Sequence, residues 1–291
     1  MMMPTPKGGL RIMFKQLAGI LAFALCTLQV TGLAQQMPPP GAIDEKTEAA
    51  LQRLCDFYKN LDSYVVTSKV TVDTEGRGQK MQQNAKIKFA VERANKFAAQ
   101  MKEGQMEGLA AASDGKRMMV VFPPSAELDV YVDQAAPTSF DKLARDPEQA
   151  MIMGDMFFFG PLSEEPYKFL MEGVTSGKYI GRETYGGIEM DHVAFTQADH
   201  DWEMWIGAGE NAQLWRVKMD LSKSVAQMMP GMKSTMTITY SNPSYNTKLD
   251  PSIWKLKPPQ GVKKVDSLME ALTGQKPPIA AGKEAPDFTL A

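Results

Sequence analysis

The feature that most constrains this chain is a hydrophobic period of two residues that begins near residue 63. Residues 65–72 read Val-Val-Thr-Ser-Lys-Val-Thr-Val, and residues 85–91 alternate as Ala-Lys-Ile-Lys-Phe-Ala-Val. Successive side chains of a β-strand point to opposite faces, so this alternation predicts strands with one buried and one wetted face. Glu-Gly-Arg-Gly at residues 75–78 predicts a turn between them. We therefore expect a hairpin of long strands.

The same pattern continues on both sides of one interruption. Short strands separated by turn residues are expected at residues 96–102, 106–112, 117–122, 127–132, 177–182, 188–196, 202–206, 213–221 and 234–240. Connections this short leave no room for crossover helices and predict an antiparallel meander. Residues 137–150 and 161–171 are expected to be helical, and the stretch 151–160 between them has seven large apolar residues in ten.

The number of strands limits the shape of the sheet. These periods predict about eleven strands and three helices. A sheet of that length cannot stay flat, so it must curl into a barrel or half-barrel. The predicted fold class is mainly β (α+β), a curled antiparallel half-barrel with helices covering the concave face.

A helix is expected before the first strand, and a shorter one near the end of the chain. Residues 44–61 have a capping residue, Asp44, and apolar residues at helical spacing. Cys55 has apolar neighbours there, which favours a small core residue over a nucleophile. Residues 249–262 predict a turn, a last short strand and a proline stop, and residues 264–273 predict a terminal helix.

Residues 1–34 have the layout of a secretory signal peptide. Three cationic residues precede an apolar run at 17–28, and Gly32 and Ala34 suit cleavage after Ala34. The run is too short to predict a membrane span, so no stable transmembrane segment is expected after cleavage. The residue before Cys26 is Leu25, where a lipid-modified cysteine needs a small residue. The chain is therefore expected to be exported without lipidation.

The charge balance argues against one class of partner. The 32 Lys and Arg residues are matched by 34 Asp and Glu residues, which gives a formal net charge of −2. A nucleic-acid binder needs clustered Lys and Arg, so no nucleic acid is expected as a partner.

Residues suited to catalysis or metal binding are few. The sequence contains no phosphate loop, no Gly-x-Ser-x-Gly and no His-Glu-x-x-His. We therefore predict no enzymatic activity, no catalytic residues and no cofactors. His192 and His200 could bind a metal only if a tight hairpin brought both imidazoles together. We favour a paired strand position for His192 and a solvated turn for His200.

Methionines gather in the interrupting segments and in the late strands. Methionine is flexible and polarizable, so surfaces that accept variable apolar ligands use it. One interpretation is a Met-lined cavity under the helices, and the alternatives are an ordinary soft core or Cu(I) binding by thioethers. Trp202 and Trp205 point to opposite faces of their strand, so one is expected in the concave core and the other under a helix. The predicted ligand-binding residues of the apolar cavity are Met156, Phe158, Phe169, Trp202 and Trp205.

The stretch 181–206 carries a family resemblance. Tyr-Gly-Gly at 185–187, Asp-His-Val-Ala-Phe at 191–195 and Asp-Trp-Glu-Met-Trp-Ile at 201–206 resemble an uncharacterised family of exported bacterial proteins, predicted to be periplasmic. The likeness extends from about residue 45 to residue 259. That family is similar to the periplasmic lipoprotein carrier and its receptor, which share a curved antiparallel sheet with helices as a lid. The resemblance implies a location in the periplasm or cell envelope.

A second resemblance is confined to residues 282–291. Gly-Lys-Glu-Ala-Pro-Asp-Phe-Thr-Leu resembles the entry strand of thioredoxin-like redoxin domains, and the chain ends before any Cys-x-x-Cys. Thiol-disulfide chemistry therefore cannot reside in these residues. The resemblance favours the hypothesis that the chain is the front part of a longer fusion.

Five segments follow from these observations. They are a signal peptide (1–34), a leader (35–43), a lipoprotein-carrier-like domain (44–262), a helix and linker (263–281) and a redoxin-like stub (282–291). The first functional hypothesis is a non-enzymatic binder of acyl chains or lipidated proteins. The alternative is an accessory domain that contacts an adjacent thioredoxin-like domain or protein, and a third is a metal chaperone using His192, His200 and the methionines. A continuous apolar cavity would favour the first, and an exposed apolar patch the second.

Overall fold

One twelve-stranded sheet organises the molecule. The structure is a computed structural model and describes residues 37–39, 41–146, 155 and 157–274. The strands lie in the order β12-β6-β5-β4-β3-β2-β1-β11-β10-β9-β8-β7. Their bounds are β1 Ser63–Gly76, β2 Gln79–Glu92, β3 Lys96–Glu103, β4 Ala110–Ser113, β5 Arg117–Val121, β6 Val130–Ala135, β7 Val174–Tyr185, β8 Ile188–Gln197, β9 Asp201–Gly207, β10 Leu214–Asp220, β11 Met232–Tyr245 and β12 Lys263–Val265.

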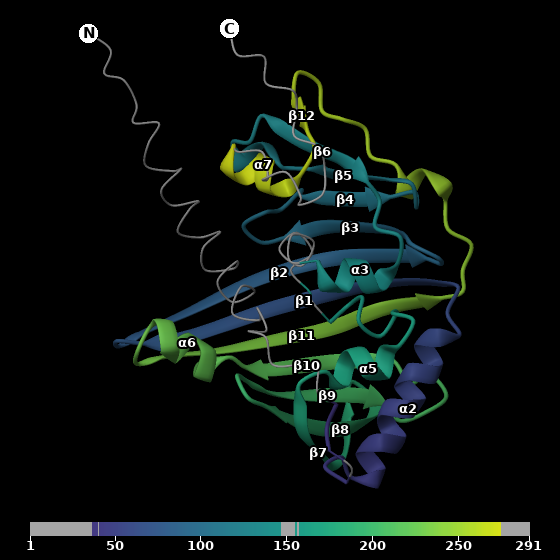
Figure 1. The fold of residues 1–291 in the computed structure, drawn as a ribbon, viewed down its shortest axis with the longest axis vertical. Helices are drawn as coiled ribbons and strands as arrows, with labels where there is room; N and C mark the ends of the chain where they lie inside the picture. Colours follow the sequence, from purple (N-terminus) through teal and green to yellow (C-terminus); the bar gives the residue numbers. More distant parts are fainter. Residues whose placement is uncertain (1–36, 40, 147–154, 156, 275–291) are drawn as a thin grey trace, which may run out of the picture.

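The sheet consists of two meanders joined at a seam. Strands β1 to β6 pair in chain order, and so do β7 to β11. The seam is the antiparallel pairing of β1 with β11, two strands of 14 residues each, in which Val70 lies opposite Ile238. Figure 1 shows this pair near the middle of the stacked strands, with β12 and β7 at the two ends. The half-barrel is therefore open, because its two edge strands do not meet.

The predicted fold class is confirmed. The sheet is curled and unclosed, and all its pairings are antiparallel except that of β12 with β6, which is parallel. Twelve strands are present where about eleven were expected. The predicted last strand near Ile253 is wrong. Asp250 accepts a hydrogen bond from the Ser252 N–H at 2.9 Å and starts a 3-10 turn at Pro251–Trp254, and the closing strand is β12.

Two tight turns set the register of the longest hairpins. Gly76 pairs with Gln79, which leaves a two-residue loop in which Arg77 and Gly78 both have positive φ. The hairpin of β7 and β8 has the same arrangement at Gly186 and Gly187. Two consecutive left-handed residues form the turn whose twist matches that of paired strands, and glycine adopts this conformation without steric cost.

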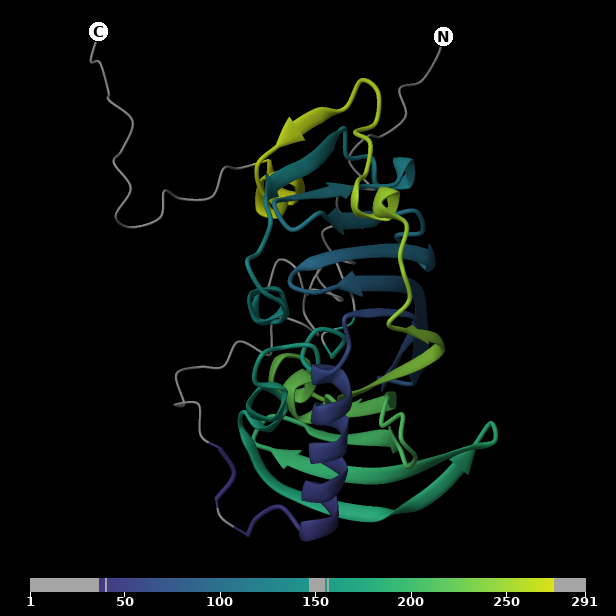
Figure 2. The same cartoon turned by 90° about the vertical axis from the view of Figure 1, so that its right-hand side faces the viewer.

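The helices of the described residues are short apart from α2. Their bounds are α2 Glu45–Lys59, α3 Phe140–Arg145, α5 Pro166–Met171, α6 Ser222–Met228 and α7 Leu268–Thr273, and α6 was not predicted. Asp44 caps α2 as expected, since its Oδ1 accepts from the Thr47 N–H at 2.7 Å. Figures 1 and 2 show α2, α3 and α5 on the same side of the sheet. They cover the concave face, as predicted.

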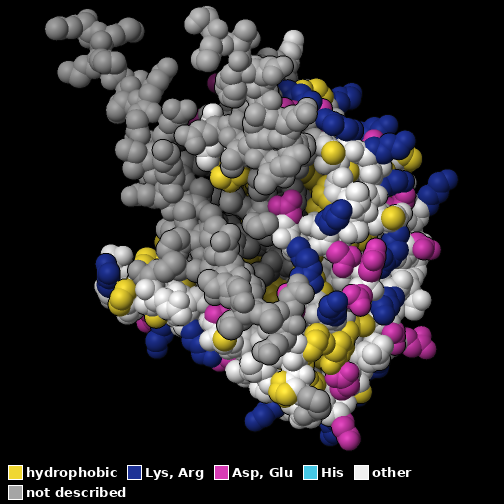
Figure 3. All heavy atoms as spheres, in the orientation of Figure 1, with side chains coloured by type: hydrophobic (Ala, Val, Ile, Leu, Met, Phe, Trp, Pro, Cys, Tyr) yellow, Lys and Arg dark blue, Asp and Glu magenta, His cyan; other side chains and the backbone are white. Residues whose placement is uncertain are grey.

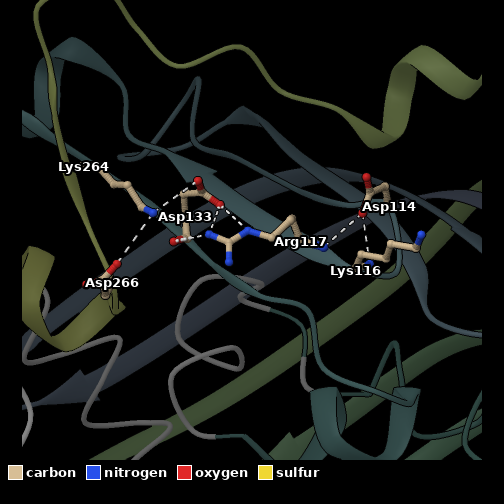
Figure 4. A network of polar contacts seen from close by, with 6 residues as sticks. All are labelled: Asp114, Lys116, Arg117, Asp133, Lys264 and Asp266. Carbon is tan, nitrogen blue, oxygen red and sulfur yellow. Dashed lines mark hydrogen bonds and ion pairs between the residues drawn. The ribbon is translucent and has the colours of Figure 1, made fainter.

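Surface ion pairs attach the parallel edge strand. In Figure 4, Arg117 of β5 binds Asp133 of β6 at 2.6 Å, and Lys264 of β12 lies 3.6 Å from the same carboxylate. Asp114 accepts two backbone N–H groups of the turn that leads into β5. Figure 3 shows acidic and basic side chains interspersed over the described part of the face it presents. Exposed ion pairs of this kind contribute little to the free energy of folding, so here they mainly fix the position of β12 beside β6.

Candidate functional site

The concave face of the sheet is a continuous apolar surface. Cross-strand pairs such as Met236 with Met219 and Val217 with Met204 place buried side chains on this face of neighbouring strands. The surface crosses the seam, so it unites residues far apart in the sequence. The lining side chains include Val66, Val70, Phe89, Met204, Val217 and Ile238.

Three consecutive phenylalanines cover the middle of this surface. Phe157, Phe158 and Phe159 are buried, and we refer to them as the plug. The ring of Phe158 stacks on Phe89 of β2, with centroids 4.0 Å apart and an interplanar angle of 15°. Phe159 meets Phe97 of β3 edge-on at 5.7 Å. A segment without regular secondary structure thus fills the centre of the half-barrel.

The plug extends across both meanders. Phe157 lies 5.4 Å from Trp202 of β9, ring centroid to ring centroid, while Phe158 and Phe159 contact strands of the first meander. Aromatic pairs of this kind contribute about 0.5–1.5 kcal/mol each beyond the area they bury. The plug therefore bridges the two halves of the sheet through ring contacts.

Two six-residue helices flank the plug. Glu164, which follows the plug, donates its backbone N–H to Asp141 of α3 at 3.0 Å. Arg145 of α3 pairs with Glu172 at 2.6 Å, and its guanidinium lies 5.2 Å from the Phe169 ring. Gly160 leaves room for that ring, since a Cβ there would meet Phe169 at 2.5 Å. The turn that ends the plug depends on this glycine.

Asp155 is a buried carboxyl two residues before the plug. Its Oδ2 accepts from the Ser68 hydroxyl of β1 at 2.7 Å, and its Oδ1 accepts from the Tyr240 hydroxyl of β11 at 3.0 Å. The Phe157 N–H also donates to Oδ1, at 3.1 Å. Burial raises the pKa of Asp155 to about 6, against the lowering effect of these hydrogen bonds. Asp155, two residues before the plug, is thus bonded to both strands of the seam.

Tyrosines surround this carboxyl and lie beneath α2. Tyr58 of α2 packs edge-on against Tyr64 of β1 at 5.7 Å, and Tyr64 stacks on Tyr245 of β11 at 5.8 Å. Tyr245 donates a hydrogen bond to Gln213, whose Nε2 is buried without a partner in the described structure. The concave face therefore has an apolar centre with a hydroxyl-rich border next to α2.

A second buried carboxyl fastens α2 to the sheet. Asp191 of β8 is bound by Arg53 of α2, by Arg182 of β7 at 3.0 Å and by the Tyr179 hydroxyl at 2.7 Å. Burial opposes its ionisation, but hydrogen bonds from Tyr179, Arg53 and Arg182 together lower the pKa of Asp191 below its usual value. This carboxylate is paired with two cations, whereas Asp155 is paired with none among the described residues.

The opposite face of the sheet carries a polar stack. The His192 imidazole stacks on the Trp205 indole at 4.1 Å, and Arg216 lies 4.7 Å from the same indole. Both imidazole nitrogens lie 2.7 Å from carboxylates, Nδ1 from Glu183 and Nε2 from Glu203. A shallow hollow of about 460 Å³ beside this stack is lined by Ala194, Thr196, Glu203, Lys218 and neighbouring residues.

The two histidines do not converge on a common ligand. His200 is buried, and its Nδ1 lies 2.8 Å from Asp199 at the other end of the β8–β9 hairpin. The solvated turn predicted for His200 is therefore wrong. Its carbonyl accepts from the Gln197 N–H, its ring lies against Asp199, and the Ser224 hydroxyl of α6 closes the turn by donating to the Asp199 carbonyl. Among the described residues no group of three or more His, Cys, Asp or Glu could hold a metal ion.

The predicted lining residues fall in different places. Phe158 is in the plug and Trp202 lies beneath it, on the concave face. Phe169 is half-buried on α5 beside Gly160. Trp205 lies on the opposite face, packed on His192 rather than under a helix. Met156 lies outside the described residues.

The structure shows how little free space remains on the concave face. A gap of about 10 Å³ lies beneath Ile87, Ala99 and Leu109, which is room for roughly one water molecule. Pockets for small ligands usually measure roughly 300–1,000 Å³. This gap is too small for such a ligand, and within the described residues the plug rings cover the middle of the face.

Sequence reasoning missed the residues that anchor the plug. Asp155 is the only charged residue in the apolar stretch 151–160. A lone acid inside such a run is the available signal, because a buried charge must find partners. The sequence does not indicate that Ser68 and Tyr240 bind Asp155, because this depends on which strands pair. Cys55 is buried in α2, as predicted, and burial raises the pKa of its thiol to about 12.

A family model matches most of the described chain. The model for predicted periplasmic protein (DUF2092) matches residues 47–268, which span both meanders and the plug. The chain belongs to this family. Membership in DUF2092 confirms the resemblance found at residues 181–206 and places the protein in the periplasm. No helix in the described residues is both long enough and apolar enough to cross a bilayer.

Solved structures related to this DUF2092 member are distant. No curated protein matches the chain. The lipoprotein LppX of Mycobacterium tuberculosis has 15% identity, covers 69% of this chain and 96% of its own, and superposes with a TM-score of 0.35. LprF of Mycobacterium bovis has 16% identity, coverages of 74% and 97%, and a TM-score of 0.37. A LolA superfamily protein of Nitrosomonas europaea has 12% identity, coverages of 72% and 97%, and a TM-score of 0.32.

Proposed function

We propose that this periplasmic protein is a non-enzymatic binder of a hydrophobic ligand, an acyl chain or a lipidated protein, on the concave face of its sheet. One observation carries the proposal. Helices α2, α3 and α5 cover parts of the apolar surface there, but its middle is covered by the three-residue plug, which has no regular secondary structure. A short irregular segment can move away from the surface it covers more easily than a packed layer of helices can. The ligand would take the place of the plug rings.

The free energies of burial set the size of a suitable ligand. Burying a phenylalanine side chain contributes about 1.5–3 kcal/mol, and burying a methylene group about 0.8 kcal/mol. A chain of roughly six to eleven buried methylenes therefore offsets the loss of the three plug contacts. Common acyl chains exceed this length, so displacement of the plug by one chain is energetically feasible.

Native mass spectrometry with organic extraction tests the proposal. The full chain would be expressed with its own N-terminal segment and purified from the periplasmic fraction. We expect a lipid at near-equal stoichiometry, either co-purified or taken up from added fatty acids and phospholipids. A protein that stays empty in both cases would overturn the proposal.

Two variants distinguish the concave face from other apolar surfaces. Phe158→Ala removes the ring that stacks on Phe89, so it should raise occupancy by added lipid. Tyr185→Ala, at the tip of the β7–β8 hairpin, should leave occupancy unchanged because this side chain is 75% exposed. Circular dichroism before each titration confirms that the variants are folded.

The exposure of edge strand β7 favours one second candidate. Ile180 and Tyr185 are both large, apolar and exposed on this strand. An exposed apolar edge is suited to protein contact, which supports a protein-interaction role as the alternative. We infer a thioredoxin-like protein as the partner from the sequence resemblance. Residues 282–291, which suggested that partner, lie outside the described residues. Tyr185→Ala would abolish binding to the partner under this alternative and would leave lipid binding intact.

A further inference from the structure

Asp155 connects the plug to the sheet through both of its carboxyl oxygens. Oδ2 is bonded to Ser68 and Oδ1 to Tyr240, one residue on each strand of the seam. Oδ1 also accepts the backbone N–H of Phe157, the first plug residue. The side chain is 1% exposed. The plug cannot move far from the sheet without breaking these bonds and exposing the carboxyl to water.

The groups that face this carboxyl are uncharged. Asp155 lies close enough to Tyr58 of α2 and Tyr240 of β11 to help raise the pKa of both phenols, and Tyr64 of β1 packs between Tyr58 and Phe158. Burial raises the pKa of all three phenols, so they remain neutral near pH 7. In the described structure no Lys, Arg or His forms an ion pair or hydrogen bond with Asp155.

A buried carboxyl without a cation binds its proton more tightly than one in water. With the plug in place the pKa of Asp155 is about 6, and exposure to water would return it towards 3.8. The state with the higher pKa is favoured as pH falls. Acid therefore favours the covered state, and the advantage is lost as pH rises through about 6.

We propose that Asp155 is a latch that makes the plug open more readily at neutral pH than in acid, so that ligand binding on the concave face weakens as the pH falls. The proposal rests on the proposed function for its ligand, but not for its opening step. It assigns the control of binding to one carboxyl, two hydroxyls and a backbone amide. The direction is the reverse of an ion-pair latch, which acid would release.

An uncharged fluorescent probe tests the latch. N-phenyl-1-naphthylamine would be titrated into the full chain at pH 5 and at pH 8. We expect the apparent Kd of the wild type to be about tenfold higher at pH 5, the change that a shift of the Asp155 pKa from 3.8 to about 6 produces over this range. Asp155→Asn cannot ionise, so its Kd should be the same at both values and higher than that of the wild type even at pH 5, where an exposed carboxyl is already ionised.

Two further variants guard against trivial results. Glu103→Gln removes an exposed carboxylate on β3 that pairs with Lys86, and it should keep the full pH response. Tyr240→Phe removes one donor to the ionised carboxylate, so the midpoint of the response should move to higher pH. A wild type that binds equally at pH 5 and pH 8, or an Asp155→Asn variant that keeps the tenfold change, would overturn the latch.

Hydrogen exchange separates the latch from the ligand. After correction for intrinsic rates, the amides of residues 157–171 should exchange faster at pH 8 than at pH 5 in the wild type, and equally in Asp155→Asn. Amides of β1 serve as the internal reference. If the probe and lipids never bind but this exchange difference is found, the latch stands and the proposed function fails. If the probe binds and the difference is not found, the latch fails alone.

Discussion

Two buried carboxyl groups connect the sheet to the segments that cover it. Asp191 binds helix α2 and Asp155 binds the plug, but only Asp191 is paired with cations among the described residues. Asp191 holds α2 through Arg53 and is also bound by Arg182 and Tyr179, and its pKa is lowered although burial opposes ionisation. Asp155 holds the plug through hydroxyl and amide donors, with no cation bound to it among the described residues, and burial raises its pKa to about 6. The buried negative charge of Asp191 is compensated by two arginines, whereas an ionised Asp155 would have no compensating cation among the described residues.

This difference indicates that one cover is permanent and the other is conditional. Helix α2 has 15 residues, a capped start and a buried row that includes Leu51 and Leu54. The plug is flanked by helices of six residues and is fixed by ring contacts and one uncompensated carboxyl. Opening of this fold should therefore begin at the plug and leave α2 in place.

Core truncations give the largest expected contrast. Leu54→Ala in α2 should lower the free energy of unfolding by about 2–5 kcal/mol, since its side chain is fully buried in a fixed element. Phe158→Ala should cost less than the usual 3–5 kcal/mol for this change, because the truncated plug can leave the sheet. Chemical denaturation followed by circular dichroism measures both values. A loss of 3–5 kcal/mol for Phe158→Ala, without added binding of the apolar probe, would make the plug an ordinary core.

Neutralising the unpaired carboxyl gives the next effect. The raised pKa of Asp155 means that its favourable contribution is complete below pH 3.8 and is lost as pH rises through about 6. Asp155→Asn should therefore unfold with a free energy roughly 1–3 kcal/mol above that of the wild type at pH 8. The two proteins should converge near pH 4. Denaturant titrations at both pH values measure the difference, and a variant less stable at pH 8 would contradict it.

Removing one cation from Asp191 should have a smaller effect. Arg53→Ala leaves Asp191 bound to Arg182 and Tyr179, and 39% of the Arg53 side chain is exposed. We expect a loss of about 1–2 kcal/mol in the free energy of unfolding at pH 7, below the cost of breaking a fully buried pair. Lys80→Ala, which removes an exposed partner of Glu75, should cause no measurable change. An unchanged stability of Arg53→Ala would remove the contrast between the two covers.

The length of the ligand's alkyl chain gives the smallest expected effect and tests whether the ligand displaces the plug. Each added methylene in a series of uncharged fatty alcohols should tighten binding by about fourfold, the equivalent of 0.8 kcal/mol. An alcohol of about four carbons, below the range of roughly six to eleven methylenes, should fail to displace the plug, and one of about sixteen should succeed. Competition with the fluorescent probe measures the series. An affinity that does not depend on length would show that the chain stays outside the concave face.

Local patterns were sufficient to predict most of the sheet. The alternation around Val70 and Ile87 predicted the long hairpin. The same rule predicted that Trp202 and Trp205 point to opposite faces of strand β9. Side-chain period and turn residues act within a few positions, so they can be read without knowing the fold. The extra strand β12 was missed because three residues are too few to show a period.

The candidate site was predicted less well because it depends on distant pairing. Asp155 becomes a buried anchor only after β1 and β11 place Ser68 and Tyr240 opposite each other. The stretch 151–160 was recognised as unusually apolar, but nothing in it indicates which strands it covers. His200 was expected in solvent for the same reason, since Ser224, which helps to enclose it, comes from helix α6, which was not predicted.

The seam between β1 and β11 has a consequence for the order of assembly. Each meander can form from neighbours in the chain, but residues 63–76 must wait for residues 232–245 before the sheet is whole. A protein that crosses a membrane from its N-terminus emerges with β1 as an uncovered edge, and unpaired edges favour wrong association. Folding should therefore finish only after nearly the whole chain has been delivered, and until then β1 would be a natural site for a chaperone to bind.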